Sequence, residues 1–172
     1  MDTVEVDSAG PAFGDAADRS WLEQAVDLAT GNVERLGGPF GALVVRDGHV
    51  VGRGTNRVTA ELDPTAHAEV VAIRAACREV GDFSLAGAAL YASCEPCPLC
   101  LAASLWARLD RVVFAADRHA AERAGFDDSR FHALLGPRTG LAAWPMEVRH
   151  LEVATAQAPF DAWQRYAGRI PY

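Results

Sequence analysis

Two short motifs constrain this chain more than any other feature, and they lie thirty residues apart. The first is His67-Ala68-Glu69, and the second is Pro96-Cys97-Pro98-Leu99-Cys100. Cys97 and Cys100 are three residues apart, so a helix would present both thiolates on one face. Because His67 can supply a third ligand, the fold is expected to bring both motifs together around one zinc ion. Three protein ligands leave the fourth position of zinc open, as in catalytic sites.

Glu69 follows His67 by two residues and is expected to stand beside the metal without binding it. Zinc lowers the pKa of its bound water to about 7. A carboxylate beside that water can accept a proton and pass it to the substrate, first as a base and then as an acid. The two motifs therefore predict hydrolytic attack on an amidine-like carbon with loss of ammonia.

The remaining cysteines allow other ligand sets. Cys94-Glu95-Pro96-Cys97 is also a C-x-x-C motif, so Cys94 could bind the metal. We favour Cys97 and Cys100 because only they share a helix face behind Pro96, and we expect Cys94 to be a core thiol at a strand end. Three cysteines and a histidine could instead close a structural zinc site, but that arrangement would leave Glu69 without a role.

Apolar spacing and turn residues predict alternating strands and helices. Asp47-Gly48 between two β-type runs predicts a hairpin, and Thr65 is expected to cap the helix that carries Glu69. The expected helices are 18–36, 66–80, 97–108, 119–124 and 159–169, the expected strands are 40–46, 49–54, 87–92, 110–115 and 146–153, and 137–143 is expected as a loop. This order predicts a three-layer α/β/α fold, in which helices cover both faces of a mixed five-stranded sheet.

Composition limits the classes of function. Residues 1–17 lack apolar periodicity and are expected to be a disordered tail, followed by a single domain at 18–172. The net charge is −7, which argues against a nucleic-acid partner. All sixteen basic residues are arginine, so no lysine side chain can form a Schiff base.

The location of the protein is inferred from its cysteines and its apolar runs. No apolar run has the length of a membrane span, and the N-terminus lacks the basic start and apolar core of an export signal. Three of the four cysteines lie within 94–100, which favours metal binding in a reducing compartment. We therefore expect a cytoplasmic protein without a membrane partner.

From Gly38 to Tyr172 the sequence resembles bacterial guanine deaminases of the cytidine deaminase superfamily. The His67-x-Glu69 and Cys97-x-x-Cys100 motifs are the signature of zinc-dependent nucleobase deaminases. Two of the matching stretches, Asp-Pro-Thr-Ala-His-Ala-Glu at 63–69 and Cys-Glu-Pro-Cys at 94–97, are shared with tRNA adenosine deaminases. The others are 38–42, 106–108, Ala-Gly-Phe-Asp-Asp at 124–128 and the ending that starts at Pro159-Phe160; the last two look more like guanine deaminases.

The resemblance implies a cytidine deaminase-like fold, a zinc cofactor and conversion of guanine to xanthine and ammonia. It also implies roles for further residues. Asn56 would hydrogen-bond the base, Phe40 would pack against the ring, and Asp128 would lie near the polar edge of the substrate with a possible part in proton transfer. Tyr172 would close the pocket of a partner in a homodimer that exchanges its C-terminal segment, 158–172. Ala68 and Trp106 are the other expected substrate contacts.

Several of these residues have a second interpretation. Phe40 could be only a core residue, and Asp127-Asp128 could be a solvated turn. Trp106 lies nine residues after Cys97, about 180° around a helix, so it belongs either to the core or to an intersubunit surface. Two departures from the family pattern, Arg57 after Asn56 and Ser129 after Asp128, could alter base specificity.

Three other functions remain open at this point. A related small-molecule deaminase could act on guanosine, cytosine or an aminotriazine with the same machinery. A tRNA adenosine deaminase would need phosphate contacts that an acidic, lysine-free chain does not favour. A structural zinc module in an interaction protein would need neither turnover nor Glu69.

Overall fold

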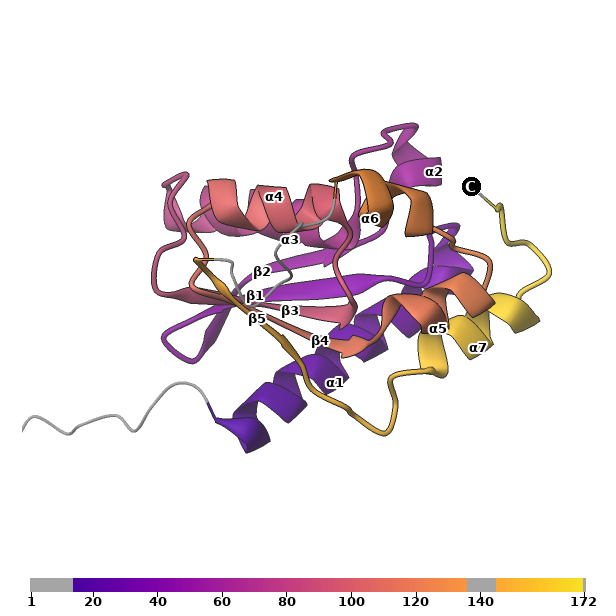
Figure 1. Ribbon diagram of the computed structural model, residues 1–172, viewed down its shortest axis with the longest axis horizontal. Coiled ribbons are helices and arrows are strands. Elements are labelled where there is room, and N and C mark those ends of the chain that lie inside the picture. Colours follow the sequence, from indigo (N-terminus) through magenta and orange to yellow (C-terminus); the bar gives the residue numbers. More distant parts are fainter. Residues whose placement is uncertain (1–13, 136–144, 172) are drawn as a thin grey trace, which may run out of the picture.

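The computed structural model describes residues 14–135 and 145–171, and these form a mixed sheet with helices on both faces (Figure 1). The sheet has five strands in the order β2-β1-β3-β4-β5. The strands are β1 (Gly41–Arg46), β2 (His49–Thr55), β3 (Ala88–Cys94), β4 (Arg111–Ala116) and β5 (Glu147–His150). β1 pairs antiparallel with β2 and β3, whereas β3, β4 and β5 run parallel. The expected fold class is confirmed.

The helices form the two outer layers. They are α1 (Asp15–Asn32), the short 3-10 helix η1 (Val33–Arg35), α2 (Val58–Glu61), α3 (Ala68–Val80), α4 (Pro98–Trp106), α5 (Arg118–Arg123), α6 (Ser129–Leu135) and α7 (Ala158–Arg165). α3 and α4 cover one face of the sheet, and α1, α5 and α7 cover the other (Figure 1). Within the described residues, no helix is both long and apolar enough to cross a membrane.

Side-chain alternation along β1 divides the core into two parts. Leu43 and Val45 pack toward α1, while Ala42 and Val44 pack toward α3 and α4. All four are buried, because β1 lies inside the sheet and has a helical layer on each side.

Glycine in β2 allows α3 to lie unusually close to the sheet. A Cβ atom at Gly54 would stand 2.1 Å from the carbonyl oxygen of Ala68 and 2.4 Å from the nitrogen of Ala72. No side chain fits in that space, so glycine is required there for steric reasons. The close contact fixes the first turn of α3, which carries the His67-x-Glu69 motif, against the end of β2.

Several boundaries differ from the expected ones. α1 begins at Asp15, so residues 15–17 are helical and do not belong to the expected tail. Thr65 does not cap α3, which begins at Ala68; its N–H and hydroxyl instead donate to Asp63 Oδ1 at 2.8 and 2.7 Å. A local side-chain turn of this kind competes with helix initiation. The expected loop at 137–143 lies outside the described residues.

Two helices were not expected from the sequence, α2 and α6. α2 has only four residues, and α6 has seven and directly follows Asp127-Asp128. Both are too short for apolar periodicity to stand out in a sequence. α6 has functional consequences, because it starts at the rim of the cavity described below.

Candidate active site

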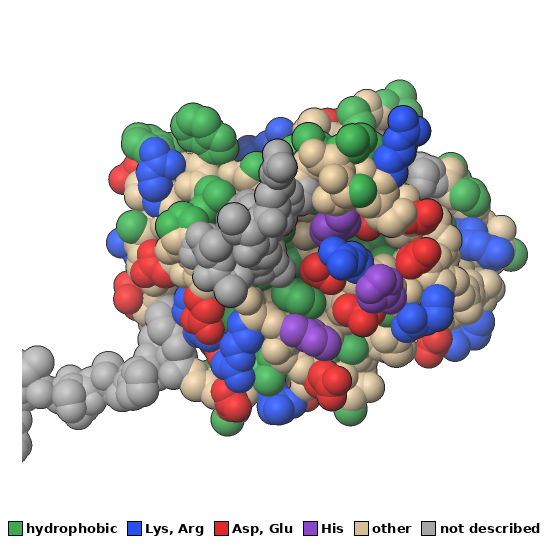
Figure 2. Space-filling model, viewed as in Figure 1, with side chains coloured by type: hydrophobic (Ala, Val, Ile, Leu, Met, Phe, Trp, Pro, Cys, Tyr) green, Lys and Arg blue, Asp and Glu red, His purple; other side chains and the backbone are tan. Residues whose placement is uncertain are grey.

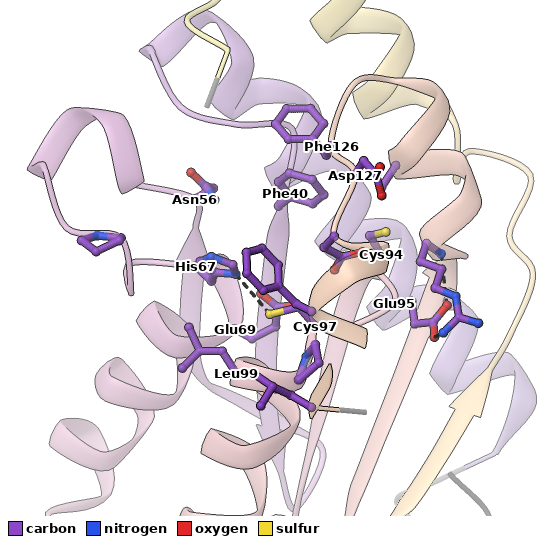
Figure 3. Close-up of a pocket in the computed structure, with 17 residues that line it drawn as sticks. Phe40, Asn56, His67, Glu69, Cys94, Glu95, Cys97, Leu99, Phe126 and Asp127 are labelled. Atoms are coloured by element: carbon purple, nitrogen blue, oxygen red, sulfur yellow. Dashed lines mark hydrogen bonds and ion pairs between the residues drawn. The ribbon is translucent and has the colours of Figure 1, made fainter. Parts of the chain in front are cut away.

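His67, Cys97 and Cys100 meet where α3 and α4 begin. His67 is the N-cap residue of α3, Cys97 is the N-cap residue of α4, and Cys100 lies in the first turn of α4. The ligand atoms form a triangle in which the Sγ–Sγ distance and both Sγ–Nδ1 distances are 3.6 Å. Figure 3 shows the contact between His67 and Cys97. Zn–S bonds of about 2.3 Å and Zn–N bonds of about 2.0 Å in tetrahedral geometry give edges of about 3.5–3.8 Å. The three residues therefore fit a zinc ion.

The electrostatics of this group also favour a cation. A hydrogen bond from Cys100, followed by one with His67, lowers the pKa of Cys97 to about 4. The same contact with Cys97, together with burial, raises the pKa of Cys100 well above its ordinary value. A divalent cation would favour the deprotonated form of both sulfurs, which would then bind as thiolates.

Glu69 is buried beside the three ligands but is not a member of the ligand group. Burial, and then the negative charge of Cys97, raise the pKa of Glu69 to about 7. A cation held by the three ligands would favour the ionised carboxylate. Glu69 is therefore placed to accept and donate protons near neutral pH.

His67, Cys97 and Glu69 line a cavity of about 410 Å³, within the size range of small-molecule sites. Cys100 is fully buried and does not line this cavity. One wall is aromatic. Phe40 and Phe126 meet edge to face with ring centres 4.9 Å apart, and Phe160 and Trp163 of α7 pack behind them. In Figure 3 the ring of Phe40 lies between Asn56 on one side and Asp127 on the other.

Asn56, Phe40 and Asp128 all line this cavity, so the structure brings these expected site residues together with the metal ligands. Asn56 is 2% exposed. Its Oδ1 accepts a hydrogen bond from the N–H of Val58 at 3.2 Å, and its carbonyl oxygen accepts one from Asn32 Nδ2 at 2.9 Å. These contacts fix the amide, and no described contact uses its Nδ2 donor.

Two expected substrate contacts, Ala68 and Trp106, are not among the described residues that line the cavity, and a third lies outside the described part of the chain. The side chain of Ala68 is buried in the core against β2, so only its backbone N–H, at the start of α3, faces outward from the helix end. Trp106 is 76% exposed and does not line the cavity, so neither a core position nor a substrate contact within this chain is correct. It ends α4 on the side away from Cys97. Tyr172 lies outside the described residues.

Cys94 occupies the position expected for a core thiol. It ends β3, is 5% exposed and donates to the carbonyl oxygen of Asp117 at 3.6 Å. Burial raises its pKa well above the ordinary value, which disfavours a thiolate. Among the described residues, the only group with ligand spacing is His67, Cys97 and Cys100.

Other wall residues were missed by sequence reasoning. Phe126 precedes the Asp127-Asp128 pair, and Glu95 lies inside the cysteine motif, so both were within matched stretches. Glu95 Oε2 accepts the N–H of Arg118 at 3.1 Å, which ties the α4 side of the cavity to the start of α5. Glu95 and Arg118 are 23 residues apart, and no sequence pattern indicates a contact between them. The spacing of Asp128 and His132, by contrast, would have indicated a contact once α6 was known.

Comparison with known proteins places this geometry in a family. Residues 15–116 match the family described as the cytidine and deoxycytidylate deaminase zinc-binding region. The chain belongs to this family. The match includes both metal motifs and Glu69, and it confirms the expected zinc-dependent deaminase class and its fold.

Two guanine deaminases extend the match toward the C-terminus, and a tRNA deaminase matches a shorter part of the chain. Guanine deaminase from Bacillus subtilis is 42% identical over 89% of this chain and 97% of its own, with a TM-score of 0.66 for its solved structure. The solved guanine deaminase from Nitrosomonas europaea is 28% identical, covers 85% of this chain and 84% of its own, and has a TM-score of 0.72. A tRNA-specific adenosine deaminase from Haemophilus influenzae is 37% identical over 67% of this chain and 65% of its own.

Proposed function

We propose that this protein hydrolyses guanine to xanthine and ammonia with one zinc ion bound by His67, Cys97 and Cys100. The observation that carries the proposal is the shared cavity. It joins a ligand group of zinc dimensions to a buried carboxylate, Glu69, and to the polar side chains of Asn56 and Asp128. The choice of guanine is supported by the 42% identity to a guanine deaminase over nearly the whole chain.

In this proposal Glu69 carries the protons. When bound, zinc supplies Lewis-acid activation of a water molecule. A carboxylate oxygen of Glu69 accepts a proton from the attacking water and delivers it to a ring nitrogen of the base. The carboxylate then takes the second proton from the newly added hydroxyl group and donates it to the amine, which leaves as ammonia while the hydroxyl oxygen becomes the carbonyl oxygen of the product. The buried position of Glu69 supports this role, because few competing water molecules reach it.

The walls of the cavity favour a flat base with both donor and acceptor groups. Phe40 offers an aromatic surface, the Nδ2 of Asn56 offers a donor, and the carboxylate of Asp128 offers an acceptor. Asp127 adds negative charge to the same cavity, whereas the charge of Glu95 is offset by Arg118, whose Nη1 lies 3.8 Å from Glu95 Oε1. On the face seen in Figure 2, acidic and basic side chains are interspersed, whereas nucleic-acid binding favours a continuous basic surface.

The proposed substrate is tested by ammonia release from zinc-loaded protein. We expect release from guanine, with guanosine, cytosine and adenosine at least about a hundredfold slower in kcat/KM, a difference of about 2.7 kcal/mol in transition-state binding. Protein stripped of metal should be inactive and should recover with zinc. If release from guanosine or cytosine is faster, that compound and not guanine is the substrate. Arg57 and Ser129 would then be the first residues to test as the cause of the changed specificity. No release from any base would support the structural zinc module.

We further propose that the active form is a homodimer in which residues after α7 close the pocket of the partner. Phe160 and Trp163 of α7 are buried against the same chain, so the proposed exchange is limited to the residues after Arg165, including Tyr172. The exposed Trp106 supports an intersubunit surface near α4. Because both metal-binding thiols must stay reduced, we place the protein in the cytoplasm.

Deletion of residues 167–172 tests the proposed closure. Since the deletion spares α7, we expect a folded protein with at least about tenfold lower kcat/KM for guanine, because the pocket would be open to water. Analytical ultracentrifugation should detect a weaker dimer. Deletion of residues 1–13 is the matched control and should change neither property. A truncated protein with full activity would contradict the closure.

A further inference from the structure

Asp128 and His132 lie one helical turn apart at the start of α6. The carbonyl oxygen of Asp128 accepts the backbone N–H groups of Phe131 at 2.9 Å and His132 at 3.1 Å, so Asp128 begins the helix. The side chain of Asp127 accepts the N–H of Ser129 at 2.9 Å, which fixes the turn before it. This local geometry places the imidazole of His132 next to the carboxylate of Asp128.

The two side chains are joined by a short polar contact. His132 Nε2 lies 3.1 Å from Asp128 Oδ2. Because an ionised carboxylate has only acceptors, the imidazole donates from Nε2. The side chain of His132 is 11% exposed and that of Asp128 is 31% exposed, so the pair is partly shielded from water.

Asp128 and His132 have different surroundings, which indicates different roles. Asp128 lines the cavity that holds the metal ligands and Glu69, whereas His132 is not among the residues that line it. His132 therefore lies behind Asp128 as seen from the cavity. Burial raises the pKa of Asp128, and the neighbouring His132 opposes that change, so the imidazole favours the ionised carboxylate.

We propose that His132 is a positioning residue that holds Asp128 Oδ2 and so keeps the carboxylate at the cavity wall, where Oδ1 is the acceptor for an N–H group of the bound base. This inference rests on the proposed function, because it assigns a binding role to Asp128. It concerns the orientation of one carboxylate and does not require His132 to touch the substrate. Holding a carboxylate in one rotamer before the ligand arrives lowers the entropy cost of binding.

Another histidine on a neighbouring helix provides a matched control. His119 Nδ1 lies 3.4 Å from Glu122 Oε2 on α5, also as a histidine–carboxylate pair within one helical turn. Both side chains are exposed, at 60% and 52%, and neither residue lines the cavity. Substitution of His119 should therefore change the same kind of contact without changing the site.

The test compares His132→Leu, His132→Gln and His119→Leu in steady-state kinetics with guanine. Leu removes the donor at similar volume, whereas Gln retains a donor that can reach the carboxylate. We expect His132→Leu to raise KM about tenfold with kcat changed less than about threefold, the pattern of lost uniform binding. His132→Gln should recover most of the loss, and His119→Leu should match the wild type. Equal melting temperatures would separate this effect from a loss of stability.

A double-mutant cycle with Asp128→Asn decides whether His132 acts through Asp128. If it does, adding His132→Leu to Asp128→Asn changes KM by less than about twofold, because the carboxylate to be positioned is already gone. If the two substitutions raise KM independently, so that their fold-changes multiply in the double variant, the proposal is overturned. Unchanged KM in His132→Leu would also overturn it.

Crystal structures of the variants distinguish this inference from the proposed function. Wild-type protein that releases no ammonia from guanine would contradict the proposed function alone. The positioning role is then read from the side chain of Asp128. A carboxylate displaced in His132→Leu but held in His132→Gln supports the role, and an unmoved carboxylate in His132→Leu overturns it.

Discussion

We expect Glu69→Gln to lower kcat for guanine by about a thousandfold while the protein keeps its full zinc content. General acid–base catalysis by one residue contributes about 10²- to 10⁴-fold, and Glu69 is proposed to act both as base and as acid. Glutamine has nearly the same shape but cannot carry the proton. The metal is retained because Glu69 stands outside the group formed by His67, Cys97 and Cys100.

The measurement pairs ammonia release with metal analysis by mass spectrometry. Glu79→Gln is the matched control, since Glu79 lies near the other end of α3 and is exposed. It should retain wild-type kcat and zinc. Turnover of Glu69→Gln within tenfold of the wild type would contradict the proton-carrier role. Loss of zinc together with turnover would mean that Glu69 supports the metal instead.

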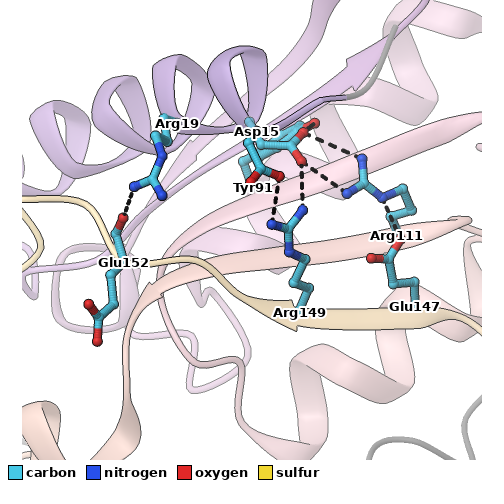
Figure 4. Close-up of polar contacts among 8 residues, drawn as sticks. Asp15, Arg19, Tyr91, Arg111, Glu147, Arg149 and Glu152 are labelled. Atoms are coloured by element: carbon cyan, nitrogen blue, oxygen red, sulfur yellow. Dashed lines mark hydrogen bonds and ion pairs between the residues drawn. The ribbon is translucent and has the colours of Figure 1, made fainter. Parts of the chain in front are cut away.

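We expect Asp18→Ala to lower the free energy of unfolding by about 3 kcal/mol, at the lower end of the cost of removing one partner of a buried ion pair. Asp18 is fully buried on α1. Its Oδ1 accepts the hydroxyl of Tyr91 at 2.7 Å, and its Oδ2 lies 3.0 Å from Arg111 Nη2 and 3.4 Å from Arg149 Nη1. Figure 4 displays these contacts between α1 and the strands beneath it.

The loss is large because the remaining groups stay buried. The side chain of Arg111 is only 12% exposed, and without Asp18 its guanidinium would keep its ion pair with the exposed Glu147, 2.7 Å away. Tyr91 is fully buried and would lose the acceptor for its hydroxyl. The cost is moderated because Glu147 still neutralises part of the charge.

Denaturant unfolding of the zinc-loaded protein measures this loss. Asp15→Ala is the matched control: Asp15 also pairs with Arg149, at 2.7 Å, but its side chain is 67% exposed. An exposed pair contributes little, so this variant should unfold at nearly the wild-type midpoint. An Asp18→Ala protein as stable as the wild type would mean that the network is not a net stabiliser. Activity at low temperature should be unchanged, because Asp18 does not line the cavity.

The sequence by itself was sufficient to predict the residues of the proposed metal site. Cys97 and Cys100 are three residues apart, and His67 and Glu69 are two residues apart. Such short spacing at the start of a helix determines which side chains can lie beside the same ion. The hairpin at Asp47-Gly48 and the alternation of strands and helices likewise depend on local signals. For that reason the mixed five-stranded sheet and its two helical layers were predictable.

Only the tertiary structure decided which residues far apart in the sequence meet, both in the core and around the cavity. Asp18 meets Tyr91 and Arg111 across 73 and 93 residues of chain, and no local pattern encodes such pairs. Trp106 follows the helical period away from Cys97, but its exposure depended on what packs against α4. α6 is too short to show periodicity, so the contact between His132 and Asp128 appeared only in the folded chain. Spacing within one element is a local property, whereas the composition of a cavity wall is set by the packing of several elements.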